Sequence, residues 1–224
     1  MHDDMGRLLD TITALGSKDW YAREALAKNP NTPGEALAVL AMDEYNYVRE
    51  GVAVNPNTPA EVLMKLARDK NSDVRWGVAW NSNTPAKLLA KLTTDDALGV
   101  RRVVAGNRRS AAETLNKLAT DEFSDVREAV AKNPSTPGEV LVILATDEYW
   151  YVRCTVAGNP NAPGEVLDRL AGDENIHVRG AVAVNPKITP EAITLLCFSE
   201  DTRTRQALSE NPAVPEHIRV GLSL

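Results

Sequence analysis

The chain has little of what most enzymes, metal sites and disulfide frameworks are built from. Of its 224 residues only two are cysteine and three are histidine, and aromatic residues make up 5%. Cys154 and Cys197 form no Cys-x-x-Cys pair, and the histidines lack metal-ligand spacing. There is no glycine-rich phosphate loop and no Gly-x-Ser-x-Gly motif. The sequence therefore predicts a non-catalytic protein with no metal and no cofactor.

Basic charge and long apolar runs are missing as well. The formal net charge is −6, whereas proteins that neutralise nucleic-acid phosphates usually have a basic surface. No apolar run reaches the roughly 18 residues that a membrane-spanning helix needs. The acidic N-terminal stretch MHDDMGRLLD has no apolar core of a secretory signal. We expect a soluble, cytoplasmic monomer whose partner is neither a membrane nor a nucleic acid.

What the chain does have is an internal repeat. Shifting the sequence by 26 residues superimposes six Val-Arg pairs, together with Ala22-Arg23 and Thr204-Arg205 at the two ends. An asparagine follows each of these arginines by six residues, so eight repeats share one period with no net insertion. The arginines include Arg49, Arg75, Arg101, Arg127 and Arg153, and the asparagines include Asn55, Asn81, Asn107, Asn133 and Asn159.

One repeat, VREGVAVNPNTPAEVLMKLARD, has the pattern of two short helices. Val48, Gly51 and Val52 share one face of a helix that Asn55-Pro56 should end, since proline disfavours helical geometry in the residue before it. The second helix is predicted to begin at a capping box, with Thr58 as N-cap and Glu61 three residues later. All 13 prolines fall in such turns.

These patterns predict an all-α protein, an α-solenoid of eight 26-residue, two-helix repeats. We expect residues 1–16 to form an N-terminal capping helix. Residues 17–224 are expected to form a single solenoid whose last repeat is truncated.

The repeated unit VRxxVAxNPNTPxExLxxLAxD resembles the leucine-rich-repeat-variant family of bacterial proteins over residues 17–224. The resemblance implies a right-handed superhelix similar to HEAT and armadillo arrays, in which the second helix is either α or 3₁₀. It implies no particular activity. The founding member carries a cysteine cluster for an iron–sulfur centre, which has no counterpart here, so this cofactor is not expected.

The recurring residues allow two interpretations. The arginines could bind an acidic polymer, or each could pair with an aspartate at a repeat boundary, such as Asp69 or Asp95. The acidic composition favours the second interpretation. The asparagines lie on the buried side of the first helix, and we expect their amides to bond the backbone of the next repeat.

Partner binding is expected at positions that vary between repeats. On the first helix, the residue before the Val-Arg pair and those three and seven positions later share a face that carries five of the eleven aromatic residues. Tryptophan, tyrosine and arginine dominate interface energetics. We therefore predict a protein- or peptide-binding surface here, although the same aromatic residues could simply cover grooves between repeats. The predicted anchors are Tyr47, Glu50, Trp76, Trp80, Arg102 and Tyr151.

The same place could also bind other ligands. The fourth repeat replaces the turn VNPNTPAE with GNRRSAAE, so that Arg101, Arg102, Arg108 and Arg109 could bind an anion, unless this is only a solvated turn. Trp76, Trp80 and Asp73 also resemble the tryptophans and aspartate with which some HEAT-like solenoids excise DNA bases. The net charge argues against this nucleic-acid alternative.

Overall fold

The computed structural model describes residues 19–222, and every regular element among them is a helix. The predicted helix over residues 1–16 lies outside this range. The described chain divides into two compact units, the first ending at Ser110 and the second beginning at Ala111. The all-α prediction is confirmed. The single solenoid domain, like the hand of its superhelix, stays a prediction.

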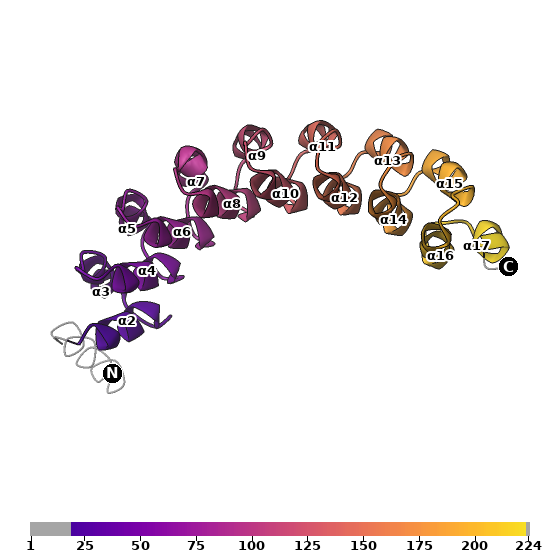
Figure 1. The fold of residues 1–224 in the computed structure, drawn as a ribbon. Helices are drawn as coiled ribbons and strands as arrows, with labels where there is room; N and C mark the ends of the chain where they lie inside the picture. The colour runs from indigo at the N-terminus through magenta and orange to yellow at the C-terminus, as the bar shows by residue number, and fades with distance from the viewer. Residues whose placement is uncertain (1–18, 223–224) are drawn as a thin grey trace. The chain divides into compact units, whose positions relative to one another are not determined.

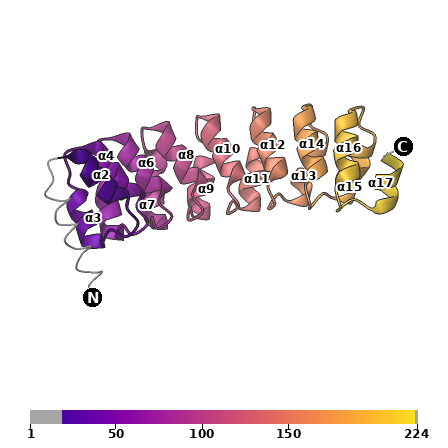
Figure 2. The same ribbon diagram turned by 90° about the horizontal axis from the view of Figure 1, so that it is seen from below.

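The helices of each unit form two layers, and successive first helices pack against one another (Figures 1 and 2). In unit 1 the first helices are α2 (Trp20–Lys28), α4 (Asn46–Val54), α6 (Ser72–Trp80) and α8 (Leu98–Gly106). The second helices of unit 1 are α3 (Gly34–Leu40), α5 (Ala60–Leu66) and α7 (Ala86–Lys91), which continues as the 3₁₀ turn η1 (Leu92–Thr94).

Unit 2 repeats this arrangement. Its first helices are α10 (Ser124–Lys132), α12 (Trp150–Gly158), α14 (Ile176–Val184) and α16 (Thr202–Glu210). The others are α9 (Ala112–Leu118), α11 (Gly138–Leu144), α13 (Gly164–Ala171), α15 (Pro190–Cys197) and α17 (Glu216–Leu222). The second helices are thus α-helices, and within residues 19–222 only η1 has 3₁₀ geometry.

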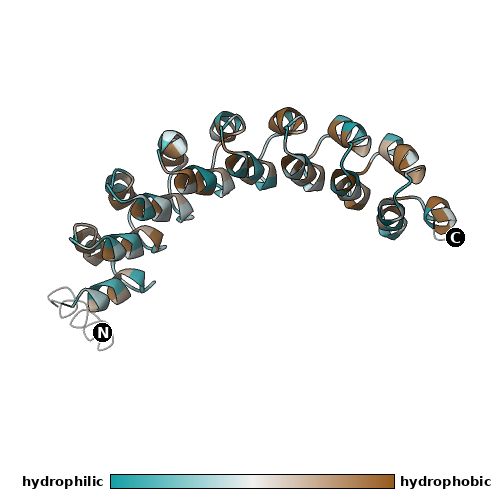
Figure 3. Ribbon diagram, in the orientation of Figure 1, coloured by the Kyte–Doolittle hydropathy of each residue, from teal (hydrophilic) through white to brown (hydrophobic). Residues whose placement is uncertain are grey.

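The core lies between the layers and is built from a few aliphatic positions per repeat. In the second repeat Val48, Val52 and Leu63 are completely buried, and Leu66 is nearly so. Each helix carries hydrophobic residues on one part of its circumference and hydrophilic residues on another (Figure 3). Helices as short as these could not bury such a face alone, so each repeat depends on its neighbours for stability.

A glycine sets the spacing of the first helices in unit 1. A Cβ atom on Gly77 of α6 would lie only 2.9 Å from the Cβ of Ala53 on α4. Any larger residue at this position would push the two helices apart. Gly77 therefore brings α6 close to α4, and the side chains on the neighbouring exposed faces approach one another as well.

The predicted capping box is wrong for the second repeat. Helix α5 begins at Ala60, after Pro59, and has no side-chain N-cap hydrogen bond. The Thr58 hydroxyl instead donates to the carbonyl oxygen of Val52 at 2.6 Å. Carbonyls in the last turn of a helix lack helical partners, so the threonine serves the end of α4 rather than the start of α5. The predicted arrangement is present at α15, with Thr189 as N-cap and Pro190 as its first residue.

Candidate partner-binding surface

The recurring asparagines join each repeat to the one before it. Asn81 is 2% exposed, and its Nδ2 donates to the carbonyl oxygens of Ala53 and Asn55, both at 2.8 Å. Its Oδ1 accepts a hydrogen bond from the backbone N–H of Asn83. The sequence predicts bonds to the next repeat, but the amide reaches back to the carbonyls left open where α4 ends. The same pair of bonds is made by Asn55, Asn107, Asn159, Asn185 and Asn211.

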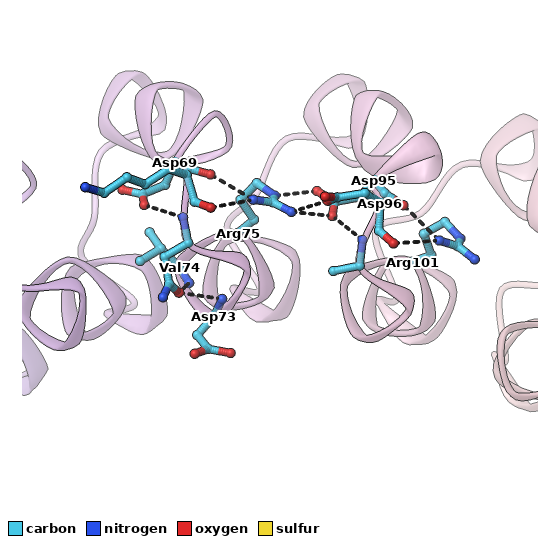
Figure 4. Close-up of polar contacts among 10 residues, drawn as sticks. Asp69, Asp73, Val74, Arg75, Asp95, Asp96 and Arg101 are labelled. Atoms are coloured by element: carbon cyan, nitrogen blue, oxygen red, sulfur yellow. Dashed lines mark hydrogen bonds and ion pairs between the residues drawn. The ribbon is translucent and has the colours of Figure 1, made fainter.

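The recurring arginines act at the repeat boundaries, where each binds the aspartate that ends its own repeat and the backbone that ends the preceding one. Arg75 binds Asp95 through two hydrogen bonds, Nε to Oδ2 at 2.6 Å and Nη2 to Oδ1 at 2.8 Å (Figure 4). Its Nη1 donates to the carbonyl oxygen of Asp69, and Nη2 also contacts the exposed Asp96. A planar guanidinium is suited to bridging a carboxylate and a carbonyl in this way. Equivalent ion pairs are Arg23–Asp43, Arg49–Asp69, Arg127–Asp147 and Arg153–Asp173.

These pairs change the acidity of the aspartates. Burial by itself would raise the pKa of Asp69, but the hydrogen bonds from Arg49 and from the Asn71 N–H hold it below its ordinary value of about 3.8. The same opposing causes leave the pKa of Asp43 and of Asp173 low. The carboxylates therefore stay ionised and occupied by arginine at neutral pH.

Arg179 differs from these arginines because the aspartate that would pair with it is replaced by a serine. Ser199 stands where the other repeats place the aspartate, and its hydroxyl accepts the Asp201 N–H at 3.3 Å, as an aspartate would. Arg179 still donates to the carbonyl of Asp173 at 2.8 Å. Within residues 19–222, no carboxylate lies within ion-pair distance of Arg179.

The variant Ser199→Asp should therefore complete the missing pair and stabilise the chain by about 1 kcal/mol. Thermal unfolding followed by circular dichroism at pH 7 measures the gain. Ser199→Asn is the matched control, because it keeps a hydrogen-bond acceptor and adds no charge. An Asp variant that melts no higher than the Asn variant would contradict this explanation of Arg179.

The variable face of unit 1 carries a stacked tryptophan pair. The rings of Trp76 and Trp80 on α6 have centroids 5.5 Å apart and are inclined by only 7°. Trp80 is 62% exposed, and Trp76 is partly buried. The Trp76 ring leans toward α8, because its Cδ1 would lie 3.8 Å from a Cβ atom placed on Gly99. A Cβ atom placed on Gly106 would meet no atom within 4 Å, so the space beside that residue is open. The pair thus presents a solvent-facing aromatic surface.

Charged side chains flank the pair on both sides. Glu50 on α4 and Arg102 on α8 are one 26-residue period before and after Trp76, and Asp73 lies one turn before it on α6. None of these three side chains has a hydrogen-bond or ion-pair partner among the residues that the structure describes. Burial raises the pKa of Glu50, the nearby Asp73 and Glu24 add to this, and Lys28 opposes it. We call this part of the protein the Trp76 surface, which consists of Glu50, Asp73, Trp76, Trp80 and Arg102.

Tyr47 belongs to a second aromatic group at the start of unit 1. Its ring lies 5.6 Å from that of Trp20, which also stacks on Tyr21 and Tyr45. Trp20 and Tyr45 fall just outside the positions chosen from the sequence, so the prediction missed them. The aromatic residues clustered before each Val-Arg pair were the available signal.

Tyr151 lies in unit 2, and the structure assigns it a local contact. Its hydroxyl bonds the Ser124 hydroxyl at 2.6 Å, and its ring meets Trp150 edge to face. Trp150 also lies 5.1 Å from His177. Tyr151 therefore helps to join α12 to α10, and we do not include it in the Trp76 surface.

The four arginines suggested as an anion patch have different environments. Arg101 is 8% exposed, and its Nη1 donates to the carbonyl of Asp95, as in the other recurring arginines. Arg102, Arg108 and Arg109 are exposed, and Arg109 donates to the carbonyl of Ser82 at 3.3 Å. An anion site here would thus have three accessible arginines rather than four.

Neither a metal site nor a membrane span is found within residues 19–222. No group of three or more His, Cys, Asp or Glu side chains in that range is arranged to hold a metal ion. No helix of the described chain is long and apolar enough to cross a membrane.

Three segments of the chain, residues 48–71, 125–148 and 150–175, match the family model described as leucine rich repeat variant. These segments are leucine-rich-repeat-variant repeats. The family resemblance stated from the sequence is thereby confirmed. Residues 72–124, which contain Trp76, Trp80 and Arg102, lie outside the matched segments, as do residues 1–47 and 176–224.

Solved structures agree with these repeats in fold. One of them is described as a leucine-rich repeat variant with a novel repetitive protein structural motif. Its sequence is 24% identical to this chain, and the two structures superimpose with a TM-score of 0.67. The match covers 93% of this chain and 87% of that one. YibA of Escherichia coli is 16% identical with a TM-score of 0.55, over 93% of this chain and 96% of that chain. No curated protein matches the chain. The similarity shows a helical repeat fold. It does not show a function, which has to be inferred from the exposed side chains.

Proposed function

We propose that the chain is a non-catalytic scaffold of the cytoplasm that binds a segment of another protein at the Trp76 surface. The observation that carries the proposal is the stacked, solvent-facing pair of Trp76 and Trp80. Tryptophans that are accessible to a partner, as Trp80 is and Trp76 is in part, are typical of interface hot spots.

The pattern of variation supports the same function. Arg75 and Asn81 stand at recurring positions and are occupied with backbone and carboxylate partners, so they have no donors left for a ligand. Trp76, Trp80 and Arg102 occupy positions that differ between repeats. In a repeat protein, such positions are free to adapt to a partner.

The nucleic-acid alternative finds less support. A DNA or RNA backbone placed over the tryptophans would bring its phosphates close to Glu50 and Asp73, two unneutralised carboxylates. Arg102 would oppose this repulsion, as would the exposed Arg108 and Arg109 if the backbone reached them. A protein segment, which can carry charge of either sign, fits the surface better.

Affinity capture with the purified chain tests the proposal. The double variant Trp76→Leu/Trp80→Leu should keep the wild-type helical signal and melting temperature, because neither ring is in the core, yet lose the captured partner. The partner is then titrated with purified proteins, where a loss of about 100-fold is expected for two hot-spot residues. Trp150→Leu, an exposed tryptophan of unit 2, is the control. Equal binding by the double variant and this control would overturn the proposal.

A further inference from the structure

We propose that the protein segment bound at the Trp76 surface carries an arginine or lysine side chain, which lies against the tryptophan rings and pairs with Glu50 and Asp73. This inference rests on the proposed function and specifies the chemistry of the partner. It follows from three features of unit 1: carboxylates without a hydrogen-bond or ion-pair partner, an aromatic face beside them, and the position of Arg102 on the side away from Glu50.

The carboxylates are unpaired because one residue of the repeat has changed. In the first repeat, Glu24 is paired with Lys28 one turn later, with Nζ and Oε1 2.6 Å apart. The corresponding residues in the second repeat are Glu50 and Val54, so Glu50 has no cation one turn later on its own helix, although the charge of Lys28 on α2 still acts to lower its pKa. Glu50 is partly buried, and burial raises its pKa against the lowering effect of the Lys28 charge. A cation from a partner would supply what Lys28 supplies to Glu24.

The glycine at position 77 concentrates this charge. Gly77 lets α6 approach α4, and the charge of Asp73 on α6 adds to the raised pKa of Glu50 on α4. Two carboxylates in one place repel each other and attract a cation. Neither has a partner in the described part of the chain, so a guanidinium or ammonium group could bind both without displacing an existing contact.

The tryptophans favour the same group. A cation over the face of a tryptophan ring is attracted by the ring quadrupole, and the aliphatic stem of lysine or arginine packs well on an aromatic surface. Trp76 lies between Glu50 on α4 and Arg102 on α8. Arg102 repels a cation from its own side, so the basic side chain is directed toward α4. An acidic segment would instead be repelled by the carboxylates of Glu50 and Asp73.

Selection from a library of displayed random short peptides tests this inference, because it needs no identified partner. Wild-type protein is the bait, and the Trp76→Leu/Trp80→Leu variant removes peptides that bind elsewhere. The selected peptides should be enriched in arginine or lysine. Replacing that residue with citrulline or norleucine in a synthetic copy should weaken binding about tenfold, measured by fluorescence anisotropy.

Two matched charge variants locate the contact. Glu50→Gln/Asp73→Asn (the Gln/Asn variant) should bind the basic peptide about tenfold more weakly, whereas the matched control Asp125→Asn/Glu128→Gln on α10 of unit 2 should bind it as well as wild type. The Gln/Asn variant should also melt at least as high as wild type at pH 7. The pKa of Glu50 is raised in the folded state, so its ionisation destabilises the fold as the pH rises above its ordinary value of about 4.5.

Acidic or uncharged peptides that bind at the tryptophans would overturn this inference and leave the proposed function standing. Absence of any enrichment over the double variant would also overturn it. Loss of the proposed function has a different signature, since the captured partner would then bind the double tryptophan variant as well as wild type.

Discussion

The variant Asn81→Ala is expected to unfold with a free energy about 3 kcal/mol below that of the wild-type chain. The side chain is nearly inaccessible, and its Nδ2 is the donor that satisfies the Ala53 carbonyl in the last turn of α4. Without it, that carbonyl, the Asn55 carbonyl and the Asn83 N–H all lose a partner where little water can replace it. Urea unfolding followed by circular dichroism measures the loss.

Asn83→Ala is the matched control for this experiment. Asn83 is exposed, and its Nδ2 makes a single hydrogen bond across the repeats, to the Pro56 carbonyl at 2.6 Å. Since water can replace that donor, the control should lose less than about 1 kcal/mol. If the two variants were equally stable, the recurring asparagines would not hold the repeats together.

Removing one arginine should have an effect of similar size. In Arg49→Met, the Asp69 carboxylate keeps only its hydrogen bond from the Asn71 N–H and becomes a nearly buried, unpaired charge. We expect a loss of about 3 kcal/mol. The double variant Arg49→Met/Asp69→Asn removes the uncompensated charge and keeps the acceptor for Asn71, so it should recover more than half of the loss. A double variant less stable than Arg49→Met would contradict this account.

The pH dependence gives an independent readout of the same pair. The pKa of Asp69 is lower in the folded state than its ordinary value of about 3.8. The pair therefore contributes fully above that pH, and its contribution disappears as the pH falls through the lowered pKa. The double variant, which has no carboxylate at this position, should lose less stability on acidification than wild type does.

The sequence predicted the repeats, both helices of each repeat and the structural partners of the arginines, because each of these recurs with a fixed period. Agreement over many copies removes the ambiguity that any single short helix would have. The capping box failed because Thr58 can serve either helix of the joint, and its hydroxyl donates to the Val52 carbonyl, which also accepts the Asn55 N–H. The preference of threonine for helix ends does not by itself decide whether its side chain serves the end of one helix or the start of the next.

The surface was predicted only in outline, for physical reasons. The sequence placed Trp76, Trp80 and Arg102 on one face, but how closely α6, which carries Asp73, packs on α4, which carries Glu50, depends on the spacing that Gly77 permits. Arg101 is adjacent to Arg102 in sequence, yet one is nearly buried and the other exposed, since neighbouring helical residues point about 100° apart. Trp20 joins Tyr47 through a contact between repeats that no local pattern specifies.

The most direct test is the emission of the two tryptophans themselves. The chain has four tryptophans, and the variant Trp20→Phe/Trp150→Phe leaves only Trp76 and Trp80 as reporters. On addition of the captured partner, or of a basic peptide from the selection, their emission should shift to shorter wavelength as the partner excludes water from the rings. A partner that binds this variant with wild-type affinity and leaves the emission unchanged would show that the Trp76 surface is not where the protein binds.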